Sequence, residues 1–141
     1  MDKEKIIGNI DHIVIAVRSI EKAKSFFSKL LDTEFEEIDI NEEVGFRNVM
    51  SPGGVELVEP TRPDSLLAKF IDQKGEGLYA LAFTVRDIDE AQAKAEKMGI
   101  RIIGSVNSDK EPVKGLREIW LHPKDNFGVL VMFAQDNPYH P

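Results

Sequence analysis

The sequence contains no cysteine and only three histidines among its 141 residues. The absence of cysteine excludes disulfide frameworks, thiolate zinc sites and cysteine nucleophiles. Since the three imidazoles are those of His12, His122 and His140, any metal site would have to include carboxylates.

Long apolar runs and a basic surface are also missing. The charged start is followed only by Ile6-Ile7 before Gly8, and no run of about 18 apolar residues occurs. We therefore expect a cytoplasmic protein with no signal peptide and no membrane partner. The 18 basic and 25 acidic side chains give a net charge of −7. This balance argues against a nucleic-acid partner, because phosphate neutralisation needs clustered Lys and Arg.

An internal repeat organises the chain. Residues 10–23 align without gaps with residues 78–91, at a constant offset of 68 that takes His12 to Ala80. Four pairs are identical: Val17 and Val85, Arg18 and Arg86, Ile20 and Ile88, Ala23 and Ala91. Self-similarity at this spacing predicts two modules, each of about half the chain.

Each module begins with an apolar, β-branched strand and continues into a helix that starts at Ser19 or Asp87. Residues expected to face inward from the helices are Ile20, Ala23, Phe27, Leu30 and Leu31, then Ile88, Ala91, Ala95 and Met98. The further strands are expected at Phe35–Ile40, Gly45–Met50 and Val55–Val58, then at Arg101–Ile103, Leu116–Leu121 and Val129–Ala134. Each module therefore has the order β-α-β-β-β.

One such module is too small to bury its own sheet, so the two must pair. The predicted fold is α+β, with two paired β-α-β-β-β modules forming a half-open, cup-shaped mixed sheet around a ligand site. We expect one domain over residues 1–141: module 1 at 8–60, a linker helix at 61–75, module 2 at 76–135 and a tail at 136–141. Exposed sheet edges favour a homodimer.

Several runs along the chain resemble the vicinal oxygen chelate (glyoxalase) superfamily, and most closely its methylmalonyl-CoA epimerase branch. They are Ile10–Val17, Val55–Pro60, Asp64–Phe70, Gly75–Gly77, Leu121–Lys124 and Gly128–Val131. The linker helix and Gly75-Glu76-Gly77 are the most specific of these. The resemblance implies a glyoxalase-like fold.

It also implies a divalent metal held by four strands, which stabilises an enolate while a carboxylate moves a proton. His12 matches the first metal ligand and Glu56 the second. Ala80 stands at the third position and Met132 at the fourth, where the family has an imidazole and a carboxylate. The further acid/base Glu of the epimerases falls on Asn48.

The repeat leads to the same conclusion. His12 corresponds to Ala80 and Glu56 to Met132, so the second module has lost both polar groups. A thioether is too soft to replace a carboxylate for a hard metal. Two alternatives stay open: Mn, Co, Ni or Zn held by His12 and Glu56 with substrate oxygens, or acid/base work by this pair without any cofactor. Asn48 cannot shuttle protons at neutral pH, which favours binding over epimerisation.

The first hypothesis is a glyoxalase-fold protein that binds a small molecule, or an isomerase- or lyase-like enzyme, with a degenerate metal site. Its catalytic residues would be His12 and Glu56, and its substrate-binding residues Asn48, Ala80 and Met132. The ligand would be an acyl-CoA or a small carboxylic acid. The alternatives are an active metal-dependent epimerase or glyoxalase-type lyase with a reduced ligand set, and a protein-binding scaffold.

Overall fold

The computed structural model describes residues 5–38 and 45–139 of the chain. Within these ranges lie eight strands, three α-helices and one short 3-10 helix. They are β1 (Ile7–Ala16), α1 (Ile20–Leu30), β2 (Glu36–Ile38), β3 (Phe46–Met50), β4 (Val55–Pro60), α2 (Leu66–Lys74), β5 (Gly77–Val85), α3 (Ile88–Lys97), β6 (Ile102–Asn107), β7 (Arg117–Leu121), η2 (Pro123–Asp125) and β8 (Leu130–Gln135).

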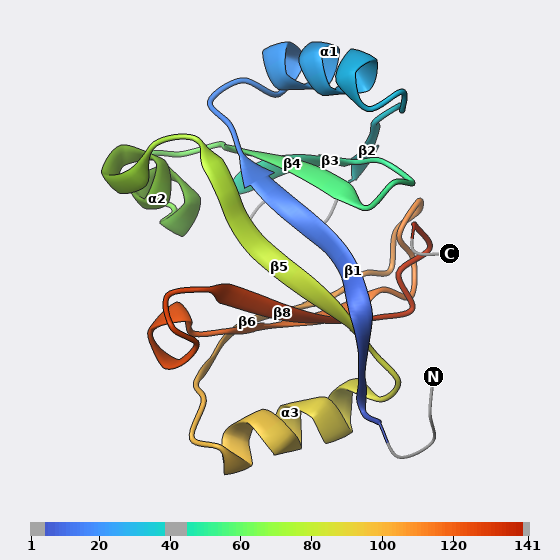
Figure 1. Ribbon diagram of the computed structural model, residues 1–141, viewed down its shortest axis with the longest axis vertical. Coiled ribbons are helices and arrows are strands. Elements are labelled where there is room, and N and C mark those ends of the chain that lie inside the picture. The colour runs from blue at the N-terminus through green and yellow to red at the C-terminus, as the bar shows by residue number, and fades with distance from the viewer. Residues whose placement is uncertain (1–4, 39–44, 140–141) are drawn as a thin grey trace.

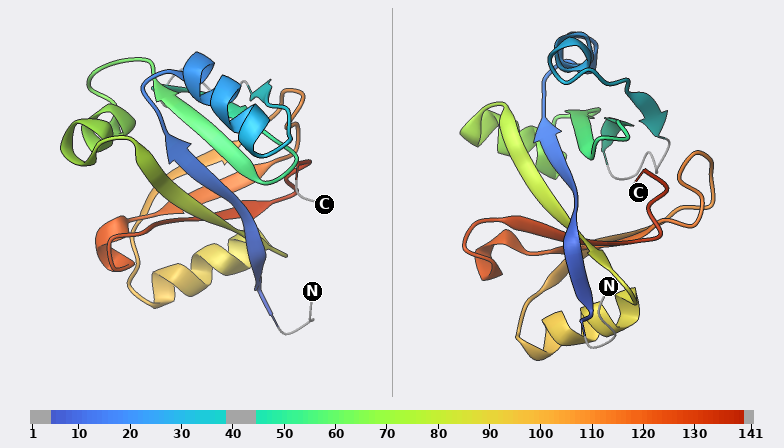
Figure 2. Two further views of the ribbon diagram at one scale, coloured as in Figure 1. Left: turned by 45° about the horizontal axis from the view of Figure 1, so that its top comes forward. Right: turned by 45° about the vertical axis from the view of Figure 1, so that its right-hand side comes forward.

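All eight strands belong to one sheet of order β2-β3-β4-β1-β5-β8-β7-β6. β1 and β5 are antiparallel at its centre, while β1–β4 and β5–β8 are parallel pairs. The sheet curls so that its two halves face each other across an open side (Figures 1 and 2). This confirms the predicted α+β cup of two β-α-β-β-β units.

The strand register relates the two halves by an approximate twofold axis between β1 and β5. His12 pairs with Ala82, and Val14 pairs with Ala80. A shift of 68 residues turns each of these pairs into the other, as a twofold axis requires. The offset seen in the sequence repeat is therefore also the offset of the central strand pair.

The two longer helices cover the outer faces of the cup, one on each half (Figure 1). α1 begins after Ser19, whose hydroxyl accepts the Lys22 N–H, and it packs Ile20 against Leu57 and Val49 of the sheet. α3 begins after Asp87 and packs against strands β7 and β8. The inner faces of the strands are therefore not covered by these two helices, and they face the interior of the cup.

The inward faces of the helices were predicted correctly except at their ends. Leu30, Leu31 and Met98 are exposed, with 61%, 45% and 67% of their surface in contact with solvent. Leu30 is the last residue of α1, and the other two are C-caps. At these positions the helix surface no longer lies over the sheet. The bounds of the six further strands agree within four residues, and residues 39–40 of the strand predicted at Phe35–Ile40 lie outside the described ranges.

Gly104 of β6 lies directly under the Trp120 ring. A Cβ at this position would be 2.5 Å from Trp120 Cε3 and 3.0 Å from Cζ3. We expect Gly104→Ala to destabilise the protein by about 1–3 kcal/mol, because the indole must leave its position. Urea denaturation measures this effect.

Gly53→Ala is the matched control, since the nearest atom to its Cβ would be Ser51 Oγ at 3.7 Å. It should change the free energy of unfolding by less than about 0.5 kcal/mol. Equal stability of both variants would show that Trp120 does not lie over Gly104.

Candidate functional site

Three ionisable side chains meet inside the cup. His12 lies on β1, Glu56 on β4 and Glu118 on β7, and their side chains are 1%, 6% and 3% exposed. His12 Nε2 lies 3.7 Å from Glu56 Oε1 and 3.6 Å from Glu118 Oε2. β4 and β7 belong to opposite halves of the sheet, so the imidazole faces one carboxylate from each wall of the cup.

Asp11 fixes the orientation of the imidazole. The His12 Nδ1–H donates to Asp11 Oδ1 at 2.7 Å, since an ionised carboxylate can only accept. Asn137 Nδ2 donates to the same oxygen at 2.6 Å, and Thr84 Oγ1 donates to Asp11 Oδ2 at 3.0 Å. Burial raises the pKa of Asp11, but these three donors outweigh it and the net pKa is lowered. Asp11 is therefore an anion that holds the Nε2 edge of His12 toward the interior.

The inward edge of His12 has an unusual environment. Nε2 is buried and has no hydrogen-bond partner, although two carboxylates lie within 4 Å. Burial lowers the pKa of His12, but the Asp11 hydrogen bond and the neighbouring carboxylates raise it to about 9. Burial raises the pKa of both Glu56 and Glu118, and the charge of His12 opposes that rise. The surroundings therefore favour the protonated form of each of these three side chains over that of an isolated one.

The rest of the interior is mostly apolar. Ala80 and Met132 belong to the same buried cluster, together with Val14 and Val58. Asn48 on β3 is 2% exposed, and its Nδ2 has no hydrogen-bond partner. Of the five residues predicted from the sequence, His12 and Glu56 thus meet directly, while Ala80 and Met132 line the apolar side.

Three residues at this site were not predicted: Asp11, Glu118 and Asn137. Glu118 is a single carboxylate within an otherwise apolar strand ending, Ile119-Trp120-Leu121. That pattern was a signal, because a charge between inward-facing apolar residues is rarely left without a role. Asn137 lies in the segment expected to be a tail, and no local pattern indicates that it returns to Asp11.

Apolar residues from both halves of the sheet pack together next to the polar cluster. Val113 and Leu116, from the loop between β6 and β7, pack with Ile38 and Met50. Tyr139 packs against them, and its hydroxyl donates to Glu36 Oε2 at 2.6 Å. This apolar group adjoins the carboxylates, because Met50 pairs with Glu56 and Ala134 of the same group pairs with Glu118.

The side chains do not fit the metal centre that the resemblance implies. The four positions hold an imidazole, a carboxylate, a methyl group and a thioether, at His12, Glu56, Ala80 and Met132. Within residues 5–38 and 45–139, no three His, Asp or Glu side chains are arranged so that they could hold a metal ion.

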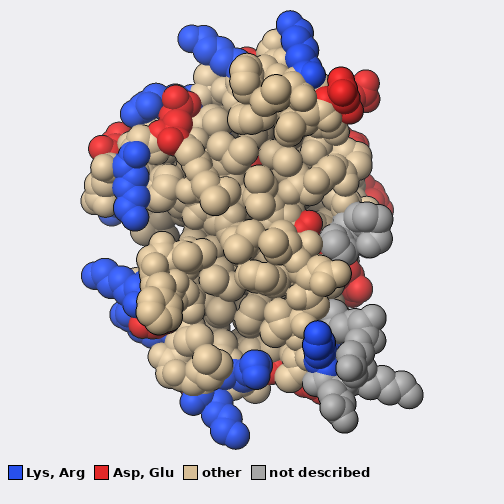
Figure 3. Space-filling view, in the orientation of Figure 1, with Lys and Arg blue, Asp and Glu red and all other residues tan. Residues whose placement is uncertain are grey.

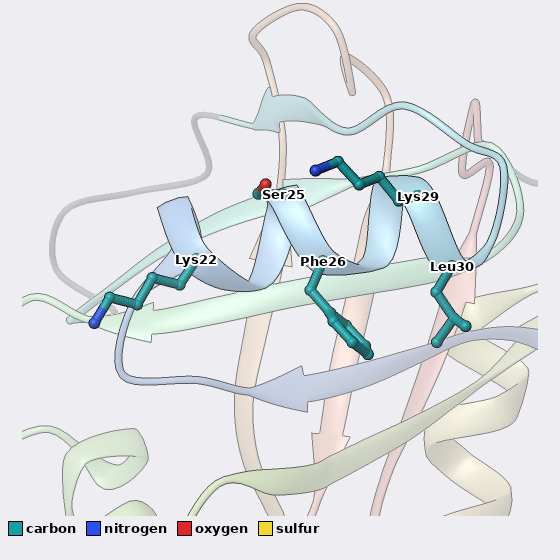
Figure 4. A pocket seen from close by; sticks show the side chains of 5 residues that line it. All are labelled: Lys22, Ser25, Phe26, Lys29 and Leu30. Atoms are coloured by element: carbon teal, nitrogen blue, oxygen red, sulfur yellow. The ribbon is translucent and has the colours of Figure 1, made fainter.

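The molecular surface offers a less suitable site. A hollow on α1 is lined by Lys22, Ser25, Phe26, Lys29 and Leu30. Figure 4 shows Phe26 and Leu30 on one side of the helix and Ser25 and Lys29 on the other, and no carboxylate is among the residues that line the hollow. Lys and Arg side chains lie around the margin of the face in Figure 3 rather than over its middle. Of the helices in the described ranges, none has the length and apolarity to cross a bilayer. The homodimer stays a prediction.

Comparison with known proteins assigns the family. The pattern of the glyoxalase/bleomycin resistance protein/dioxygenase superfamily matches residues 11–117. The chain therefore belongs to this superfamily, as its fold and sequence runs indicate.

Its relatives include methylmalonyl-CoA epimerases. The mitochondrial enzyme of Mus musculus is 32% identical over 92% of this chain and 74% of its own length. The ethylmalonyl-CoA/methylmalonyl-CoA epimerase of Cereibacter sphaeroides is 30% identical over 92% of this chain and 99% of its own. A variant of the Streptomyces coelicolor epimerase, solved with 2-nitronate-propionyl-CoA, is 30% identical with a TM-score of 0.81, covering 96% and 99% of the two chains.

Proposed function

We propose that this protein binds an acyl-CoA or a related small carboxylic acid derivative in its cup and acts on it as an isomerase-type acid–base catalyst without a resident metal. The observation that carries the proposal is the position of His12 Nε2 between two buried carboxylates, at 3.7 and 3.6 Å. The substrate class comes from the epimerase relatives, one of which was solved with an acyl-CoA analogue.

A cluster of this kind is costly unless it serves a function. Two buried carboxylates and an imidazole edge without a hydrogen bond destabilise a folded protein relative to an apolar core of the same shape. Perturbed pKa values in such a cluster are typical of catalytic sites. These polar groups lie on strands whose other buried residues are mostly apolar, such as Val14 and Val58.

The chain's own residues can supply the necessary steps. Asp11 holds the imidazole so that Nε2 faces the interior, and a protonated His12 can donate there to a carbonyl oxygen of the ligand. This positive donor favours the negative charge that develops on that oxygen when a proton leaves the adjacent carbon. Glu56, whose pKa burial raises, is within reach of the same space and can accept that proton.

Isotope exchange tests this function. The protein, treated with chelator, is incubated in D₂O with propionyl-CoA, 2-methylbutyryl-CoA and methylmalonyl-CoA, and deuterium at C2 is followed by mass spectrometry. We expect exchange with at least one thioester, and a loss of about 10²- to 10⁴-fold in His12→Gln. Absence of exchange with all three would contradict the proposal.

One observation favours a second candidate, a metal-dependent epimerase with a reduced ligand set. A histidine whose Nδ1–H is held by a carboxylate and whose Nε2 is free is the usual arrangement of a metal-bound imidazole. Metal analysis of protein purified without chelator separates the two. Stoichiometric Mn, Co, Ni or Zn, together with exchange that chelator abolishes, would favour this candidate.

A further inference from the structure

Glu118 is the least expected member of the interior cluster. It lies on β7 in the second half of the sheet, and 3% of its side chain is exposed. Its neighbours two positions away in the chain, Leu116 and Trp120, belong to apolar clusters, so packing alone does not account for a carboxylate there. Its Oε2 lies 3.6 Å from His12 Nε2, on the side opposite to β4.

The register of the sheet relates Glu118 to Asn48. In the first half Ala16 pairs with Val58, which pairs with Asn48. In the second half Thr84 pairs with Ala134, which pairs with Glu118. Ala16 and Thr84 are 68 residues apart, so Asn48 and Glu118 occupy equivalent positions of the two modules. The first module has no carboxylate at Asn48, but the second module has one at the twofold-equivalent position, Glu118, in the other wall of the cup.

We propose that Glu118 is a catalytic residue that forms a two-base pair with Glu56, each carboxylate serving one face of the substrate's C2 carbon. The inference rests on the proposed function and deepens it. Inversion of a stereocentre requires a base on each side of the bound carbon, and Glu56 and Glu118 come from opposite walls of the cup with both carboxylates near His12 Nε2. The reaction is the inversion of a 2-substituted acyl thioester.

The reaction balances without any co-reactant. One carboxylate takes the proton from C2, the C2–H bond breaks, and its electron pair moves to the thioester oxygen, where the His12 Nε2–H donates. The other glutamic acid then gives its proton to the opposite face of C2, the carbonyl reforms, and the stereocentre is inverted. The next turnover uses the two carboxyl groups in exchanged roles.

The charges around the cluster also select the substrate. Asp11, Glu56 and Glu118 surround a single imidazole. A second carboxylate on the substrate would enter a buried site that already holds several acidic groups, which like-charge repulsion disfavours. The positions where the family places ligands, Ala80 and Met132, are apolar. The site therefore favours a 2-alkyl acyl-CoA over methylmalonyl-CoA.

Stereochemistry tests the assignment. Pure (2R)- and (2S)-2-methylbutyryl-CoA are incubated in D₂O with wild type, Glu118→Gln and Glu56→Gln, and both inversion and deuterium incorporation are measured. In each variant we expect inversion to fall by at least about 10²-fold. Glu118→Gln should still exchange one stereoisomer with retention, within about tenfold of wild type, and Glu56→Gln should exchange only the other.

Glu59→Gln is the matched control. Glu59 lies on the same strand as Glu56 but accepts the Ile20 N–H on the outer face, and glutamine keeps that acceptor. It should invert both stereoisomers like wild type. If Glu118→Gln does not fold, Glu118→Asp should show the same one-sided exchange to a smaller degree.

The outcomes separate the two proposals. If wild type exchanges C2 but Glu118→Gln inverts both stereoisomers normally, the role of Glu118 is wrong while the proposed function stands. If the variant slows both stereoisomers equally in exchange and inversion, Glu118 is not one of two bases, and the inference is also overturned. Wild type that exchanges none of the thioesters contradicts the proposed function, and the inference with it.

Discussion

Replacing His12 by leucine should lower the free energy of unfolding by about 3–5 kcal/mol. The imidazole is the partner of two carboxylates in the interior, at 3.7 and 3.6 Å, and of Asp11 at 2.7 Å. Its removal leaves buried acidic groups facing one another with no positive charge between them. Chemical denaturation at neutral pH measures the loss.

The matched variant replaces His12 and the two carboxylates that face its Nε2 by apolar residues. In His12→Leu combined with Glu56→Met and Glu118→Met, no charge is left around the former Nε2 position, and Asp11 keeps the Asn137 and Thr84 donors. Exchanging a buried ionic cluster for well-packed apolar side chains is often neutral or stabilising by 1–4 kcal/mol. We expect this triple variant to be at least as stable as wild type and to lose all C2 exchange.

These two variants separate function from structure. A triple variant as unstable as His12→Leu alone would mean that the cluster is needed for folding. A loss below about 1 kcal/mol in His12→Leu would mean that its neighbours are not the buried charges described here.

The second large effect concerns metal binding. Ala80→His combined with Met132→Glu should create a divalent-metal site with four protein ligands. The register supports this prediction: Val14 pairs with Glu56 and with Ala80, while Ala82 pairs with Met132. The two substituted positions are thus the twofold equivalents of His12 and Glu56, and their side chains share the interior cluster.

Thermal unfolding with and without Co²⁺ or Mn²⁺, together with metal analysis after dialysis, measures the gain. At a metal concentration of 100 times Kd, binding stabilises the folded state by about 2.7 kcal/mol. Each single variant is a control that supplies only three of the four ligands, and it should retain less metal. A double variant that folds and retains no metal would show that the two halves are not related as the register indicates.

Much of the fold could be predicted because it depends on local patterns. The strands β1 and β5 are apolar and β-branched, and their offset of 68 residues appears directly in the sequence. It appears again in the structure, where it relates the pair of His12 and Ala82 to the pair of Val14 and Ala80. The helix starts at Ser19 and Asp87 follow from side chains that accept the first N–H groups. Leu30 and Met98 were wrongly placed in the core because periodicity does not show where a helix passes the edge of its sheet.

The site was predicted only in part, because the repeat does not keep one offset. Glu118 is 70 positions after Asn48, and Met132 is 76 positions after Glu56, since the loops of the two modules differ in length. An ungapped alignment with an offset of 68 therefore misses the equivalence of Asn48 and Glu118. Asn137 reaches Asp11 across 126 positions, a contact that only the folded chain defines.

The asparagine at position 48, where the epimerases have an acid/base glutamate, by itself favours binding over proton transfer. With Glu118 at the equivalent place in the second module, the cup keeps a second carboxylate although the first module lost it. Glu118, on a strand three places away from β1 in the sheet, therefore supports the proposed proton transfer although Asn48 cannot take part in it.

The most direct test measures metal content and C2 exchange on the same chelator-treated sample, with (2S)-2-methylbutyryl-CoA in D₂O. The His12–Glu56–Glu118 cluster should exchange and invert this thioester at a rate that does not follow the residual metal, with less than about 0.1 metal ion per chain. A rate that rises in proportion to added Mn, Co, Ni or Zn, and vanishes without it, would contradict metal-free acid–base catalysis.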